Sequence, residues 1–178
     1  MEVAVALGVG SIVGAILLYA LVQGVWLFRA NESEMWARNE GSSVIRVIRD
    51  DIQAAQDVRI YSDYTNVGGT ESQNGSCAVI DLPDGSSVSY YRSPVTPLVS
   101  GSGVTDQIYY HADGSTAPDP ATDKLLSSGV LNFEFRRNPN GTVRVAFILG
   151  IFGYPRHLLG TVESDRLRFT TSAIPRNP

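Results

Sequence analysis

The residues that could do nucleophilic or metal chemistry in this chain are few and widely spaced. His111 and His157 are the only histidines, and neither has the His-Glu-x-x-His spacing of a zinc site. No serine lies in a Gly-x-Ser-x-Gly sequence, the nucleophile elbow of the α/β-hydrolases. We therefore expect both histidines at the surface or in loops. We predict no catalytic, cofactor-binding or metal-binding residue and expect no enzyme.

Two groups of carboxylates offer other chemistry. Asp113, Asp119 and Asp123 fall in one loop and carry the oxygen ligands that calcium takes, but their spacing is not that of an EF-hand. Asp50 and Asp51 are adjacent within a helical pattern and so point to different faces of the helix. This placement favours charge balance with neighbouring arginines over acid–base catalysis.

Glu2 is the carboxylate with the most unusual surroundings, because Val3 to Phe28 contains no charged residue. A run of 18 or more apolar residues is typical of a membrane-spanning helix, and this one would extend roughly 39 Å. A charge inside such a helix costs about 2.5–3.5 kcal/mol and usually marks a functional position. Glu2 therefore needs a place among lipid headgroups or a cationic partner, for which the amine of a neighbouring subunit would serve.

Small and aromatic residues within the apolar run suggest how it packs. Gly10 and Gly14 are four residues apart and share a helix face, a spacing that lets two helices approach closely. The alternative is ordinary membrane-helix composition. Trp26 and Trp36 bracket the end of the run and would lie at the membrane interface or pack between helices.

The helical pattern continues beyond the apolar run and becomes amphipathic. Val44, Ile48 and Ile52 recur at intervals of four residues among charged side chains, which predicts one buried stripe. We expect one helix to about Val58, disturbed near Gly41. The chain thus divides into an apolar helix (1–28), its amphipathic continuation (29–59) and a globular head (60–178).

The rest of the chain has the period-two alternation of β-strands, interrupted by turn residues. The predicted strands lie at Cys77–Leu82, Val88–Arg92, Gln107–His111, Leu131–Arg136, Thr142–Leu149 and Arg166–Thr171. About five or six antiparallel strands would leave one apolar face, and the helix stripe is the obvious cover for it. The predicted fold is therefore α+β, with one long N-terminal helix packed on an antiparallel sheet.

This pattern resembles the superfamily of type IV pilins and type II secretion pseudopilins. The family's mature chains start with Phe-Thr-Leu-x-Glu followed by apolar residues, and Met1–Leu7 (MEVAVAL) is similar to that motif without its first three residues. Glu2 then stands at the signature glutamate. The segment Ile45–Ala55 (IRVIRDDIQAA) is similar to the corresponding helix of J-type minor pseudopilins and PilW-like pilins.

The resemblance implies a mechanical role. The subunit would wait in the bacterial inner membrane, be processed by a prepilin peptidase, and be packed by the inner-membrane assembly machinery into a helical filament with other pilins. Glu2 would pair with the N-terminal amine of an adjacent copy, an amine that the family methylates. The filament would be a cell-surface pilus or, as the alternative, a periplasmic pseudopilus with this chain at its tip.

A further alternative is a single-pass anchored protein with an exported binding domain, which leaves Glu2 without a role. An anchored enzyme has no group of residues in its favour. The net charge of −4 argues against a nucleic-acid partner.

Overall fold

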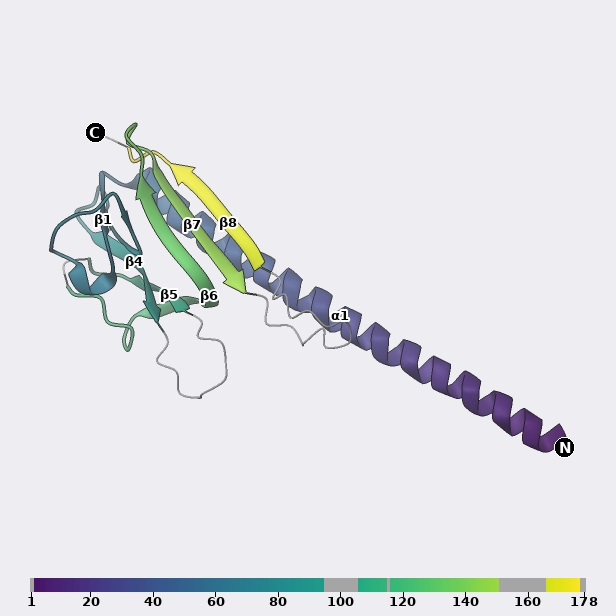
Figure 1. The fold of residues 1–178 in the computed structure, drawn as a ribbon. Helices are drawn as coiled ribbons and strands as arrows, with labels where there is room; N and C mark the ends of the chain where they lie inside the picture. The colour runs from purple at the N-terminus through teal and green to yellow at the C-terminus, as the bar shows by residue number, and fades with distance from the viewer. Residues whose placement is uncertain (1, 95–105, 115, 151–165, 177–178) are drawn as a thin grey trace.

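In the computed structural model the chain forms a rod and a head (Figure 1). The structure describes residues 2–94, 106–114, 116–150 and 166–176, without the side chains of residues 2–6, 30 and 94. One helix, α1 (Glu2–Ala54), makes the rod. Its C-terminal half lies along the sheet of the head, and its N-terminal half projects beyond the sheet. The predicted α+β fold is confirmed.

Helix α1 is continuous through Gly41, where we expected a disturbance, and it ends earlier than predicted. The expected end at about Val58 is wrong, because α1 stops at Ala54 and strand β1 (Asp57–Tyr61) begins at Asp57. Val58 and Ile60 are buried and pair with strand β3. Both are β-branched residues, which fit a pleated sheet better than a helix.

In the described part of the chain, eight strands form one antiparallel sheet with the order β1-β3-β4-β5-β6-β7-β8, and β2 pairs with β6. The six predicted strands are present, whereas the expected count of five or six is too low because β1 and β2 are added. The remaining bounds are β2 (Asn74–Gly75), β3 (Cys77–Asp81), β4 (Ser87–Pro94), β5 (Asp106–His111), β6 (Lys124–Arg137), β7 (Val143–Gly150) and β8 (Arg166–Ala173).

The long strand β6 changes partner along its length, and this curls the sheet. Its first half pairs with β5 as far as Val130, and its last residues pair with β2. Strand β2 also approaches β1 so closely that a Cβ at Gly75 would lie 1.7 Å from the carbonyl oxygen of Tyr61. Only glycine fits there. The edge of the sheet at β1 thus comes close to β6, through β2.

The amphipathic half of α1 covers the concave face of the sheet, where it contacts β6, β7 and β8. Val44, Ile48 and Ile52 are buried in the main core of the head. Beside this stripe, the hydroxyl of Tyr90 in β4 donates a hydrogen bond of 2.5 Å to Asp51 of the helix. Burial and this hydrogen bond raise the pKa of Tyr90, so the phenol stays a donor.

A smaller cluster packs on the opposite face of β3, β4 and β5. Cys77, Val79 and Tyr91 are fully or almost fully buried there. Tyr64 from the short 3₁₀ helix η1 (Tyr64–Asn66) packs against Tyr91 with its ring tilted and 5.0 Å between ring centroids. Burial raises the pKa of the Cys77 thiol to about 12. This cysteine is therefore a core residue and a poor nucleophile at neutral pH.

The contact between Gly41 and Phe169 fixes α1 against β8, and it yields a testable prediction. A Cβ at Gly41 would lie 2.3–2.7 Å from three carbons of the Phe169 ring. We expect Gly41→Leu to lower the free energy of unfolding by about 1–3 kcal/mol through overpacking. Denaturant unfolding of the full chain in detergent would measure this. Ser42→Leu adds the same side chain at an exposed neighbouring position, and equal stability of the two variants would contradict the prediction.

Candidate functional site

The N-terminal half of α1 presents apolar side chains on every side, and no described part of the head covers them. Within the described residues this is the one helix long and apolar enough to cross a membrane, and none of its apolar window is buried. An apolar helix exposed all round requires a lipid or protein environment. The large exposed side chains are Leu7, Val9, Ile12, Val13, Ile16, Leu17, Leu18, Tyr19, Leu21, Val22, Val25, Trp26, Leu27 and Phe28.

The predicted packing residues lie along this projecting half. Glu2 is the first residue of α1, and its side chain lies outside the described residues. A Cβ added at Gly10 or Gly14 would meet no atom within 4 Å, so the glycines leave a notch that the described chain does not fill. Trp26 is 43% exposed. These residues thus lie on the part of the helix that the sheet does not reach.

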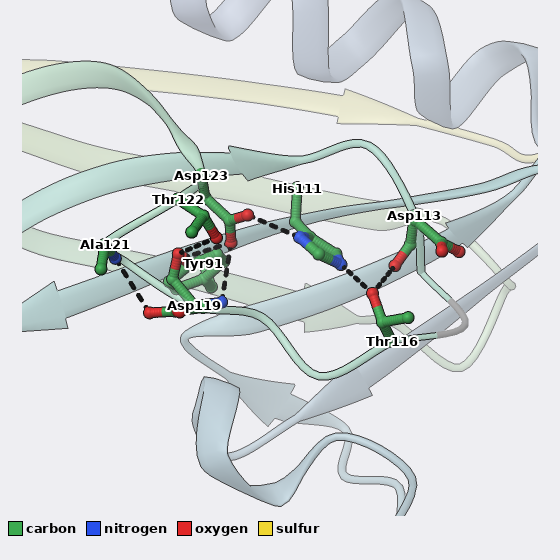
Figure 2. Close-up of polar contacts among 8 residues, drawn as sticks. All are labelled: Tyr91, His111, Asp113, Thr116, Asp119, Ala121, Thr122 and Asp123. Atoms are coloured by element: carbon green, nitrogen blue, oxygen red, sulfur yellow. Dashed lines mark hydrogen bonds and ion pairs between the residues drawn. The ribbon is translucent and has the colours of Figure 1, made fainter.

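A second site is polar, and it joins the loop after β5 to the outer face of the sheet (Figure 2). The carboxylate of Asp123 lies 2.6 Å from Nδ1 of His111 and accepts a hydrogen bond of 2.6 Å from the hydroxyl of Tyr91. The backbone N–H of Asp119 donates to the same carboxylate at 2.9 Å. The side chain of Asp123 is only 6% exposed, so these partners replace the water that the charge has lost.

The acid chemistry of Asp123 follows from these contacts. Burial alone would raise the pKa of Asp123, but the hydrogen bonds from Tyr91 and His111 outweigh it and hold the pKa below its ordinary value. The same burial and the contact with Asp123 raise the pKa of Tyr91. Asp123 therefore stays ionised and Tyr91 stays a donor at neutral pH.

His111 also contacts Thr116, which gives an Asp–His–Thr arrangement. Nε2 of His111 lies 2.8 Å from the Thr116 hydroxyl. That hydroxyl donates to the carbonyl oxygen of Asp113, and the backbone N–H of Thr116 donates to the same oxygen. The Thr116 hydroxyl thus has two acceptors within reach, Nε2 of His111 at 2.8 Å and the Asp113 carbonyl oxygen at 3.1 Å, while the Thr116 N–H is already bonded to that oxygen. The arrangement fastens the loop to the sheet.

Sequence reasoning placed His111 in a surface or loop position and missed this network. His111 is the last residue of β5 and its side chain is 12% exposed. The available signal was that His111 shares one face of the predicted strand with Tyr109, two residues before it. No group of three histidine, cysteine, aspartate or glutamate side chains within the described residues could hold a metal ion. His157 lies outside those residues.

Asp123 provides a prediction about acid stability. Because its pKa is lowered in the folded state, it stabilises the fold above about pH 4, and this contribution is lost as the pH falls through the folded pKa. We expect Asp123→Asn to lower the free energy of unfolding at pH 7 by about 1–3 kcal/mol, because three donors lose an ionised acceptor. It should also weaken the dependence of stability on pH below about pH 4.

Denaturant unfolding between pH 3 and 7 would test this prediction. The exposed Glu71 lies in the loop between η1 and β2, and Glu71→Gln should leave stability at pH 7 almost unchanged. Equal effects of the two substitutions would show that the buried network contributes nothing.

Comparison of the chain with protein-family models, with curated proteins and with solved structures gives no match. The architecture itself is pilin-like, with a long N-terminal apolar helix whose second half packs on an antiparallel sheet. The apolar helix suggests membrane anchoring or export.

Proposed function

We propose that this chain is a structural subunit of a type IV pilus-like helical filament, held in the bacterial inner membrane by α1 before assembly. The observation that carries the proposal is the difference in burial between the two halves of one continuous helix. The residues of α1 that face the sheet are buried in the head, whereas its first half is apolar on all sides and is covered by none of the described residues. A bundle of such helices from many copies would remove that surface from water.

The same helix fits both states that a filament subunit passes through. In the membrane, lipid covers the apolar half of α1, and in a filament the helices of neighbouring subunits replace the lipid. Small residues allow close approach between helices where no hydrophobic gain remains, and Gly10 and Gly14 supply an unfilled notch for it. Assembly would then exchange one apolar environment for another without exposing the helix.

Glu2 would set the register of the filament. Its position at the start of a helix without further charge to Phe28 leaves it in an apolar core after assembly. A buried charge without a partner is strongly destabilising, and the N-terminal amine of an adjacent copy would neutralise it. A prepilin peptidase and the inner-membrane assembly machinery are the partners that this route requires, and other pilins would share the filament.

The second candidate is a minor pseudopilin at the tip of a periplasmic type II secretion pseudopilus. The similarity of Ile45–Ala55 to J-type chains favours it. A single-pass anchor for an exported binding domain is a third candidate, because one apolar helix is enough for anchoring. These candidates differ in whether copies of this chain polymerise with one another.

Substitution of Glu2 tests the register role. We expect Glu2→Ala and Glu2→Leu to reduce the yield of sheared filaments by roughly tenfold or more, since an unpartnered amine in the core costs several kcal/mol. The amount of subunit in the membrane should not fall. Electron microscopy and immunoblotting of sheared and membrane fractions would measure both quantities.

The matched control for Glu2 is Glu32→Ala, which removes an exposed carboxylate from the same helix. It should leave the filament yield unchanged. Wild-type filament yield from both Glu2 variants would remove the register role, and a wild-type chain that forms no filament would favour an anchor or a tip subunit.

The notch at Gly10 and Gly14 gives a separate prediction. Gly14→Leu should lower filament yield by roughly tenfold, the equivalent of about 1.4 kcal/mol of lost helix packing. Ala20→Leu adds a large side chain on another side of α1 and serves as the comparison. Fractionation of membranes and filaments would report the effect. Equal yields from the two variants would mean that the notch is ordinary membrane-helix composition.

A further inference from the structure

The charges of the head are separated along the chain. Ser62–Asp123 carries eight acidic side chains and one basic side chain, whereas Lys124–Pro178 carries eight basic and three acidic side chains. The sign changes at the start of β6, between the two halves of the sheet. Strands β3, β4 and β5 therefore lie in an anionic half of the head, and β6, β7 and β8 lie in a cationic half (Figure 1).

The cationic half has an arginine face, which we define as Arg136, Arg144, Arg166 and Arg168. In β6, β7 and β8 the phenylalanines and valines point into the core, so the alternate arginines lie on the opposite, outer face. Arg136 and Arg144 are directly opposite each other in the register of β6 and β7. Opposed like charges destabilise a sheet, so the pair favours an anionic partner.

These four arginines have no ion pair among the residues that the structure describes, in contrast to other arginines of the head. Arg59 and Arg92 form ion pairs with Asp81 and Asp106 at 2.8 and 3.3 Å. Arg136, Arg166 and Arg168 are exposed, and Arg144 is half-buried. The guanidinium groups of the arginine face are therefore available to a second molecule.

The anionic half presents an acidic rim, which we define as Asp84, Asp113 and Asp119. All three residues are exposed. The N–H of Gly114 donates to the carbonyl oxygen of Ser87 at 2.7 Å, which places the loop of Asp113 beside the strand that follows the Asp84 turn. The network of Asp123, His111 and Tyr91 then holds the rest of this loop, with Asp119, on the outer face of the sheet (Figure 2).

We propose that the arginine face of one subunit docks on the acidic rim of the next copy of this chain. Two complementary surfaces at different places on one molecule make a heterologous contact, and repetition of such a contact gives a ring or an open helical filament. The inference rests on the proposed function. It adds a contact between the heads of neighbouring subunits to the packing of their helices. Charge complementarity on one chain is what selects a second copy as the occupant.

Electrostatic contacts at a protein surface set specificity and association rate more than total affinity. They are screened within about 8 Å at physiological ionic strength. The rate of filament assembly should therefore fall as salt is raised, while subunits that are already packed through their helices should stay together.

Reversal of charge tests the contact in the full chain. Arg144→Glu with Arg168→Glu makes the arginine face acidic, and Asp84→Lys with Asp119→Lys makes the rim basic. We expect each double variant alone to lose at least about tenfold in filament yield, since like charges then face each other across the contact. A mixture of the two double variants should regain filaments, in which the two kinds of subunit alternate.

The matched control for the arginine double variant is Arg46→Glu with Arg176→Glu. It makes the same change in net charge at exposed positions outside the arginine face. It should assemble like the wild-type chain. Thermal unfolding of each variant would show that the head is folded, and the salt dependence of wild-type assembly provides a measurement that needs no variant.

The possible outcomes separate this inference from the proposed function. Wild-type filaments together with normal assembly of both double variants, or failure of the mixture, would overturn the docking contact and leave the filament proposal standing. Normal assembly of the arginine variant with loss of binding to phosphatidylglycerol vesicles would also overturn the contact, because lipid would then be the occupant. If the wild-type chain forms no filament, the proposed function itself fails.

Discussion

The structure depends on one constraint, which is that the apolar surface of α1 must be kept away from water. Burial of each large aliphatic or aromatic side chain is worth about 1.5–3 kcal/mol, and the head provides that burial only for the stripe around Val44, Ile48 and Ile52. The first half of the helix carries large side chains on every side and finds no cover among the described residues. These side chains therefore need cover from outside the described residues, for which a lipid or protein environment is suited.

The head has a mechanical relation to this helix because the two are joined by a long interface and not by a flexible linker. The ring of Phe169 lies against Gly41, and Tyr90 donates a hydrogen bond to Asp51, further along α1. Helix α1 runs without interruption from the uncovered half into this interface. A force applied to the rod is thus transmitted into the core of the sheet, and the orientation of the rod sets the orientation of the outer face.

Much of this fold could be predicted from the sequence, because its signals are local. Alternation of apolar and polar residues located six strands, and spacing of apolar residues located the helix. Strand β1 was missed because Ile52, Ala55 and Val58 continue a helical spacing, while the pairing of Val58 with Ile80 is a long-range contact. The two residues of β2 carry too short a pattern to detect. The bond between His111 and Asp123 closes a loop, and no local pattern indicates which ends of a loop meet.

In the proposed filament, the apolar helix would contribute affinity, and the charged groups of the helix start and the head would select one arrangement of the subunits. Apolar side chains attract without direction, so a bundle of smooth helices could slide with little change in energy, and affinity alone would not define one arrangement. A carboxylate at the start of α1 and a sheet whose two halves differ in charge each favour discrete positions, because a displaced copy would place like charges together. The separation of charge has a physical cost in the isolated subunit, where Arg136 and Arg144 face each other. An anionic surface over the pair would relieve that cost, so the interaction that destabilises one copy would favour an ordered array of many.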